Sequence, residues 1–321
     1  MLNKNITSGI NKIKGHIRQL AVKIHDNPEL ALEEKQACKW QTEILKNLGF
    51  KVQTPFANLN TAYLAEKGHG KPRVCFLAEY DALPEVGHAC GHNLICSAAI
   101  GAAESLSIAL EKESLPGTVY LAGTPAEEGK GGKLYFISSG FFKNVDVAIM
   151  AHPAHTTAIW HGGLAVERYD VSFYGKASHA SAAPEKGLNA LDAVMLLFQA
   201  VNAWRQHIPS ESRIHGIVTS GGTAPNIVPD HASCRFYLRA AKDSILKEMD
   251  KRFRDIAKGA ALMTGTKYKV VKGKEGYKAG LINRALNNEF VKIATEIGMN
   301  IKNEPKEGKG SSDFCDVTQE L

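Results

Sequence analysis

The stretch Glu79-Tyr-Asp-Ala-Leu-Pro-Glu-Val-Gly-His-Ala-Cys-Gly-His-Asn93 decides how this sequence of 321 residues folds. It follows the apolar run Val-Cys-Phe-Leu-Ala at 74–78, which predicts a strand buried on both faces. A proline and a glycine then interrupt regular structure, and Asn93 can cap the apolar helical segment that follows. Cys90 and His92 are therefore expected on a turn between strand and helix, where open α/β sheets bind ligands.

Cys90 and His92 admit three interpretations. A single cysteine is commonly a small buried hydrophobic residue, and a single histidine is commonly a hydrogen-bonded polar residue of the core. Cys90 could instead be a nucleophile with a histidine partner elsewhere in the chain. The neighbouring residues favour a metal site, because Asp81 and His88 lie in the same run and further acidic and histidine motifs follow.

Two later motifs also follow predicted buried strands. Glu127 and Glu128 come after one strand, and His152 comes after the next. All of these side chains should emerge at the same edge of the sheet as the first motif, which favours a metal site over coincidence. Adjacent side chains of an extended segment point to opposite sides, so we expect one carboxylate to bind an ion while its neighbour transfers protons.

The composition limits the class of protein. The hydrophobic content of 44% is typical of a soluble globular chain long enough for two domains. The net charge of +6 comes from scattered lysines and arginines without interleaved aromatics, so nucleic acid is not an expected partner. No apolar segment near the N-terminus suits a signal peptide or a membrane span, and the six cysteines show no disulfide spacing. A cytoplasmic protein with reduced thiols is expected.

The order of predicted elements indicates two domains. In the first part, helices are expected over 6–24, 32–48, 93–110 and 134–139, and strands over 50–52, 61–64, 74–78, 117–122 and 145–151. This alternation is typical of an α/β sheet with helices on both faces. Residues 164–274 instead follow the order β-α-β-β-α-β of a compact ferredoxin-like insert. The first domain then comprises 1–163 and 275–321.

Six motifs together resemble peptidase family M20, in its amidohydrolase branch (subfamily D), which contains p-aminobenzoyl-glutamate hydrolase-like and dipeptidase-like members. They lie at 79–93, 125–129, 152, 175–181, 221–229 and 311–314. The resemblance covers nearly the whole chain in the right order. It implies an aminopeptidase-like catalytic domain with a mixed sheet flanked by helices, and it makes the insert a lid and dimerisation domain of a homodimer.

The resemblance also implies a centre of two divalent ions, which would be zinc, manganese or cobalt. It gives Glu127 the role of general base and acid, and Asp81 the role of orienting the site. The implied metal ligands are Cys90, His92, Glu128 and His152.

The same resemblance assigns roles in the insert. His179 would reach the site of the partner subunit and stabilise the oxyanion, and Asn226 would help to hold the substrate. Arg239 is a candidate clamp for a substrate carboxylate, because a guanidinium matches that anion in a bidentate way. His215 is a weaker candidate for substrate binding.

The sequence departs from the family pattern near its end. The family has a further histidine ligand near its C-terminus, whereas this chain stops at Leu321 and has no histidine after His231. We therefore expect a truncated chain whose second ion binds weakly. The first hypothesis is a metal-dependent amidohydrolase or dipeptidase that cleaves an N-acyl amino acid, an aminobenzoyl-glutamate-like compound or a dipeptide with a metal-activated water. The alternative is an impaired dimeric fragment that only binds ligand or metal.

Overall fold

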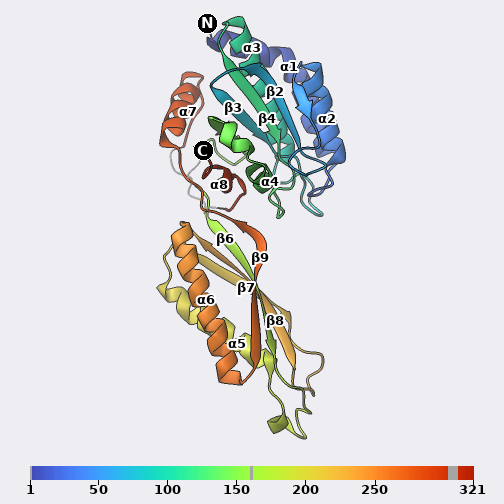
Figure 1. Ribbon diagram of the computed structural model, residues 1–321, viewed down its shortest axis with the longest axis vertical. Helices are drawn as coiled ribbons and strands as arrows, with labels where there is room; N and C mark the ends of the chain where they lie inside the picture. Colours follow the sequence, from blue (N-terminus) through green and yellow to red (C-terminus); the bar gives the residue numbers. More distant parts are fainter. Residues whose placement is uncertain (1, 160–161, 303–309) are drawn as a thin grey trace. The chain divides into compact units, whose positions relative to one another are not determined.

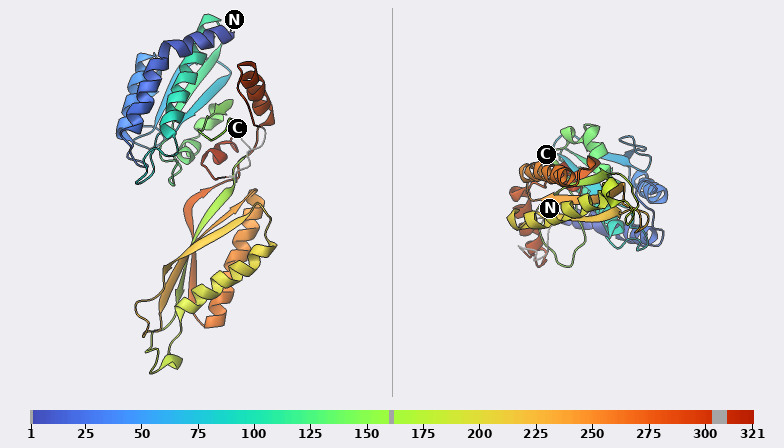
Figure 2. Two further views of the ribbon diagram at one scale, coloured as in Figure 1. Left: turned by 180° about the vertical axis from the view of Figure 1, so that it is seen from behind. Right: turned by 90° about the horizontal axis from the view of Figure 1, so that it is seen from below.

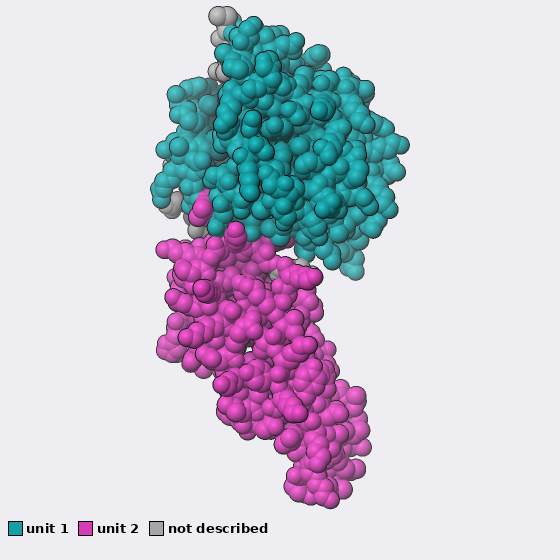
Figure 3. Space-filling model, in the orientation of Figure 1, with its two compact units in different colours: residues 1–160, 282–307, 312–321 teal, residues 161–281, 308–311 magenta. Residues whose placement is uncertain are grey.

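The computed structural model describes residues 2–159, 162–302 and 310–321. The chain divides into two compact units (Figure 3). Unit 1 comprises Met1–Trp160, Ile282–Glu307 and Ser312–Leu321, and unit 2 comprises His161–Leu281 and Gly308–Ser311. Each unit has its own sheet and core, so each is described by itself.

Unit 1 is built on a mixed sheet of five strands in the order β1-β2-β4-β3-β5 (Figure 1). Strands β3, β4 and β5 are parallel to one another, whereas β1 and β2 are antiparallel to their neighbours. The strands are β1 (Lys51–Gln53), β2 (Tyr63–His69), β3 (Arg73–Ala78), β4 (Gly117–Gly123) and β5 (Val147–Ile149). The last strand is shorter than the sequence predicts.

Helices cover both faces of this sheet (Figure 2). On one face, α1 (Leu2–His25), α2 (Lys35–Asn47) and α3 (His92–Lys112) form an apolar core with alternate strand residues. On the other face, α4 (Gly132–Ser138), the short helix η1 (Phe141–Asn144) and α8 (Phe314–Val317) form a second core. In β3, Ala78 belongs to the first core and Cys75 and Leu77 to the second, so the strand is covered on both faces as predicted.

Two local predictions about helix starts are wrong. Gly91, not Asn93, precedes α3 as its N-cap, in the left-handed conformation with φ of 79°. A Cβ at Gly91 would lie 2.9 Å from Pro153 Cγ, so glycine suits both the conformation and the contact. Asn93 instead donates from its side chain to the carbonyl of Ala21 at 3.0 Å, which ties α3 to α1. Helix α2 begins at Lys35, three residues later than expected from the sequence.

Helix α3 is apolar because it lies in the core. Within the described residues it is the one helix long and apolar enough to cross a bilayer, yet 72% of its most apolar window is buried inside the protein. A core helix meets the same criteria.

The remaining helix of unit 1 is α7 (Arg284–Glu296). All six cysteines of the chain are free thiols, as predicted.

Unit 2 has the predicted order β-α-β-β-α-β. Its four strands form an antiparallel sheet in the order β7-β8-β6-β9, and two long helices pack on it to form one core. The elements are β6 (Ala165–Tyr174), η2 (Pro184–Lys186), α5 (Ala190–Trp204), η3 (Arg205–His207), β7 (Arg213–Ser220), β8 (His231–Ala240), α6 (Asp243–Thr264) and β9 (Lys267–Tyr277). The predicted fold class, a mixed α/β domain with a ferredoxin-like insert, is confirmed.

Candidate metal centre and active site

Three parallel strands of unit 1 end at the same edge of the sheet. Ala78 at the end of β3 pairs with Gly123 at the end of β4, and Phe76 pairs with Ile149 at the end of β5. The segments that follow these strands carry the acidic, cysteine and histidine residues that the sequence singles out. The fold therefore brings the three motifs together.

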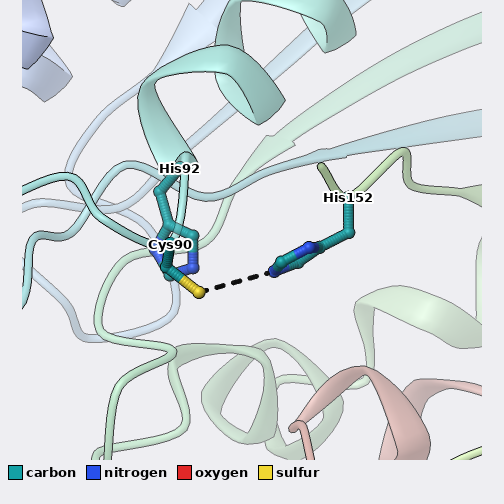
Figure 4. Close-up of side chains that lie close together, drawn as sticks. All are labelled: Cys90, His92 and His152. Atoms are coloured by element: carbon teal, nitrogen blue, oxygen red, sulfur yellow. Dashed lines mark hydrogen bonds between the residues drawn. The ribbon is translucent and has the colours of Figure 1, made fainter. Parts of the chain in front are cut away.

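Cys90, His92 and His152 form the first group of possible metal ligands. Figure 4 shows the Cys90 thiol directed at the His152 ring with His92 beside them. Cys90 Sγ lies 3.7 Å from His152 Nε2, and the two imidazole centroids are 6.0 Å apart. One ligand atom from each residue lies within 4.8 Å of the other two. The hydrogen bond of Cys90 with His152 lowers the pKa of its thiol, which favours the thiolate form that binds metals.

Asp81 orients His92. The His92 ring is completely buried, and its Nδ1 lies 3.0 Å from Asp81 Oδ1. Burial alone would raise the pKa of Asp81, but the hydrogen bond from His92 lowers it, so the carboxylate is ionised and accepts a hydrogen bond from Nδ1–H. Burial would lower the pKa of His92, but the hydrogen bond to Asp81 and the neighbouring groups raise it to about 11. Nδ1–H donates to Asp81, so Nε2 is the atom that would release its proton to bind a metal ion. His92 Nε2 has no hydrogen-bond partner among the described residues.

Glu127 and Glu128 lie on a turn, not on the extended segment that the sequence suggests. Gly129 N donates to the Glu127 carbonyl at 2.8 Å, which closes the turn. Glu128 N donates to Asp81 Oδ2 at 2.9 Å. Asp81 therefore binds both this turn and the His92 ring. Because of the turn, one carboxylate oxygen of each glutamate comes within 4.8 Å of the other and of a His92 nitrogen. The expectation that the two carboxylates point to opposite sides is therefore wrong.

A buried ion network lies beside Glu127, and sequence reasoning missed it. Lys133 is completely buried and its Nζ donates to Glu79 Oε1 and, at 2.6 Å, to Asp313 Oδ1. Burial lowers the pKa of Lys133, but the charges of Asp313 and Glu79 outweigh this effect and raise it, so the ammonium is charged. Burial raises the pKa of Glu127 to about 8, against the opposing charge of Lys133, and raises that of Asp313 to about 6.

Glu34 is a second buried acid that the sequence did not single out. Its Oε1 accepts a hydrogen bond from Ala126 N at 2.9 Å, and its Oε2 accepts one from Thr61 Oγ1 at 2.9 Å. Ala126 has φ of 62°, a conformation that costs energy for a residue with a side chain, and it directly precedes Glu127. Glu34 therefore helps to hold the backbone that presents Glu127. No sequence signal distinguishes it from the other acids of the same segment.

In unit 2 the structure brings the segments of His179 and Asn226 together. His179 forms an antiparallel bridge with Ile227, and Ala180 N donates to the Asn226 carbonyl at 3.0 Å. His179 Nδ1 accepts hydrogen bonds from two backbone N–H groups, each at 3.3 Å. Its proton is therefore assigned to Nε2, which is a hydrogen-bond donor.

Arg239 and His215 also lie together in unit 2. Arg239 Nε lies 3.4 Å from His215 Nε2, and Arg239 Nη1 donates to Ser311 Oγ at 2.8 Å. The His215 ring stacks on Tyr237 with centroids 5.7 Å apart. Partial burial and then the Arg239 charge lower the pKa of His215, so the imidazole is neutral and accepts from the guanidinium.

Comparisons with known proteins show which proteins this chain is similar to. A model of the peptidase dimerisation domain matches residues 165–263. The chain is 36% identical to Xaa-Arg dipeptidase of Mus musculus over 99% of this chain and 77% of that protein. It is 33% identical to a p-aminobenzoyl-glutamate hydrolase chain of Escherichia coli strain K12, over 91% of this chain and 65% of that protein.

A solved structure shows the same fold. The Bacillus subtilis protein described as a dinuclear metal-binding peptidase of the M20 family superimposes with a TM-score of 0.77 at 18% identity. The match covers 97% of this chain and 87% of that one. At this identity the likeness supports the fold alone.

Proposed function

The chain belongs to peptidase family M20 and is a hydrolase, and from this premise we propose that it cleaves the amide bond of a dipeptide or an N-acyl amino acid with two divalent metal ions. One observation carries the proposal. His92 is shared by two groups of possible ligands, one with Cys90 and His152 and the other with Glu127 and Glu128, and its buried Nε2 makes no hydrogen bond among the described residues. A buried nitrogen without a partner is costly unless an ion or water completes it.

We propose that the metal ligands are Cys90, His92, Glu128 and His152. Asp81 would position two of them, His92 through its ring and Glu128 through its backbone N–H. The donor set fits a divalent ion, because thiolate and imidazole are ligands of zinc and related metals and a carboxylate adds negative charge. Zinc, manganese and cobalt are the candidates. When bound, such ions polarise the amide carbonyl and lower the pKa of water at the site.

We propose that Glu127 transfers the proton. A general base works best when its pKa is near the working pH, and burial places the pKa of Glu127 at about 8 before any cation binds. Cations beside it would favour the ionised form, so Glu127 can accept the proton of the attacking water. The same carboxyl group then delivers this proton to the leaving amine, because the amine must be protonated before the C–N bond breaks.

We further propose that unit 2, predicted as residues 164–274, is a lid and dimerisation domain. His179 would donate a hydrogen bond from Nε2–H to the oxyanion in the catalytic domain of the partner subunit. Asn226 would hold the substrate, Arg239 would bind a substrate carboxylate, and His215 would support Arg239 through their contact of 3.4 Å. These assignments imply a homodimer, and the free thiols agree with the expected location in the cytoplasm.

The test is to strip the protein with a chelator, add zinc, manganese or cobalt, and measure bound metal together with hydrolysis. The substrates would include Xaa-Arg dipeptides, p-aminobenzoyl-glutamate and hippurate, because relatives of this chain are named as hydrolases of these three compounds. Hydrolysis that returns with metal supports the proposal. Metal binding without hydrolysis of any amide would favour a protein that only binds ligand or metal.

A further inference from the structure

Two buried atoms without hydrogen-bond partners face each other in unit 1. They are Glu79 Oε2 and His92 Nε2, which lie 3.6 Å apart, within the range of an ion pair when His92 is protonated but beyond that of a hydrogen bond. Both side chains are 0% exposed. Leaving a buried polar atom unsatisfied costs about 1–3 kcal/mol, and more for a charged group, so this pair calls for a partner between or beside them.

We infer that Glu79 is a further metal ligand, which binds through Oε2 the same ion that His92 binds through Nε2. The inference rests on the proposed metal centre and goes beyond its ligand set. Glu79 then belongs to the centre itself and is more than the counter-ion of Lys133.

The distance fits two ligands of one ion. Nitrogen and oxygen ligands lie about 2.0–2.2 Å from zinc, and in a tetrahedral arrangement two such atoms are roughly 3.4 Å apart. The observed 3.6 Å between Glu79 Oε2 and His92 Nε2 is close to this value. It is longer than an ordinary N–H···O hydrogen bond, which spans about 2.7–3.2 Å.

Lys133 leaves one oxygen of Glu79 available. Its Nζ donates to Glu79 Oε1 and to Asp313 Oδ1, so the ammonium occupies only one of the two Glu79 oxygens. Ligating carboxylates are themselves usually hydrogen-bonded, which fixes their direction. Oε1 is thus held by the ammonium, while Oε2 has no hydrogen-bond partner among the described residues and can bind an ion.

The local charge also favours a cation at this point. Glu79, Glu127 and Asp313 have carboxylate oxygens within 4.8 Å of one another, and Lys133 is the buried ammonium that pairs with two of them. A divalent ion between Glu79 and His92 would place positive charge beside this group of carboxylates, whereas a water molecule would not.

The decisive experiment uses the unchanged chain. Crystals grown with zinc and measured at the zinc edge would give anomalous peaks that locate each ion. A peak within about 2.3 Å of both Glu79 Oε2 and His92 Nε2 is expected. A peak on His92 with Glu79 Oε2 more than about 3 Å away would overturn this inference alone, whereas no bound ion at all would overturn the proposed function with it.

A pair of variants gives an independent readout in solution. Glu79→Gln keeps the size of the side chain and an oxygen for Lys133, but an amide is a poor ligand. Asp81→Asn is the matched control, because Asp81 contacts His92 only through Nδ1. Asp81→Asn should weaken binding of one ion by about 10- to 100-fold, as the loss of a partner that orients a ligand does, and Glu79→Gln should weaken it by at least as much.

Cobalt absorption separates the two variants. The visible bands of bound Co²⁺ report the atoms that coordinate it, so Glu79→Gln should change their positions and intensities, and Asp81→Asn should leave them as in the unchanged protein. Circular dichroism establishes that both variants fold. Identical cobalt bands in Glu79→Gln and the unchanged chain would show that Glu79 is not a ligand.

Discussion

Lys133 and Asp313 are 180 positions apart in the sequence and are joined by two hydrogen bonds. Lys133 N donates to Asp313 Oδ2 at 3.0 Å, and Lys133 Nζ donates to Asp313 Oδ1 at 2.6 Å. Both residues are completely buried. The turn before α8 is thereby fastened to the start of α4, next to the proposed metal centre, so stability and metal binding depend on the same ion network.

Removing the Asp313 carboxylate should destabilise unit 1 strongly. In Asp313→Ala the buried ammonium of Lys133 keeps Glu79 as a partner but loses Asp313 Oδ1, and the backbone N–H of Lys133 loses Asp313 Oδ2. Breaking a buried ion pair by removing one partner costs about 3–5 kcal/mol. Urea denaturation measures the loss. Glu33→Gln is the control, because Glu33 pairs with Lys35 at the surface, where ion pairs contribute little.

An Asp313→Ala variant as stable as the control would mean that water replaces the carboxylate without cost. Lys133→Met should then be compared, since it removes the buried charge together with its contacts. A double variant with Asp313→Ala and Lys133→Met should not recover the lost stability, because it leaves the buried Glu79 carboxylate without its ammonium partner.

The fold could be predicted because its signals are local. The apolar run 74–78 and the order of elements after residue 164 follow from periodicity, and the structure confirms both. Lys133 and Asp313 could not be predicted, because lysine is rarely fully buried and nothing local indicates a partner 180 residues away. Long-range pairs of this kind depend on the packed fold.

The pH dependence of stability should reveal the raised pKa of Glu34. Burial raises the pKa of Glu34 from 4.5 to about 7, so its protonated form is favoured in the folded state. The contribution of Glu34 to the free energy of unfolding is therefore largest below pH 4.5, and it is lost as the pH rises from there through about 7. The shift corresponds to roughly 3 kcal/mol across that window.

The measurement compares the unchanged chain with Glu34→Gln by urea denaturation from about pH 5 to about pH 8, the range that spans the shifted pKa. A chelator is present, so that metal binding does not add its own pH dependence. The difference in unfolding free energy should move in favour of Glu34→Gln as the pH rises. Parallel curves for the two proteins would show that Glu34 titrates normally. Glu33→Gln, the adjacent exposed position, should follow the unchanged chain throughout.

Glu127 and Cys90 should respond differently to substitution. Glu127→Gln removes the proposed base and keeps the size of the side chain, so hydrolysis should fall by about 100-fold or more while both ions stay bound. Cys90→Ala should lower metal occupancy instead, because it removes a proposed ligand. Activity and metal content are measured on the same samples. Normal turnover by Glu127→Gln, or full occupancy in Cys90→Ala, would contradict the corresponding assignment.

The site could be predicted in outline, but its details depend on backbone geometry. The strand ends and the ligand-type residues predict that Cys90, His92 and His152 lie together, and the structure places them within reach of one ion. The turn at Glu127 and Glu128 was not predicted, because it depends on hydrogen bonds donated to distant residues such as Asp81. Glu79 lies in the motif, yet only its unpartnered oxygen marks it as a possible ligand.

The last prediction concerns His179 of unit 2. Its Nδ1 accepts hydrogen bonds from two backbone N–H groups, which assigns the proton to Nε2. Nε2–H is therefore available to donate a hydrogen bond to an oxyanion. If His179 serves the partner subunit, His179→Ala and Glu127→Gln should each abolish hydrolysis, and mixing them should restore activity. The randomly mixed sample would reach about one quarter of the unchanged rate, because half of its dimers are hybrid and each hybrid has one of its two sites intact. His207→Ala is the matched control in the same unit and should retain activity. Confirmed hybrid dimers without activity would show that His179 acts within its own subunit or has no part in the reaction.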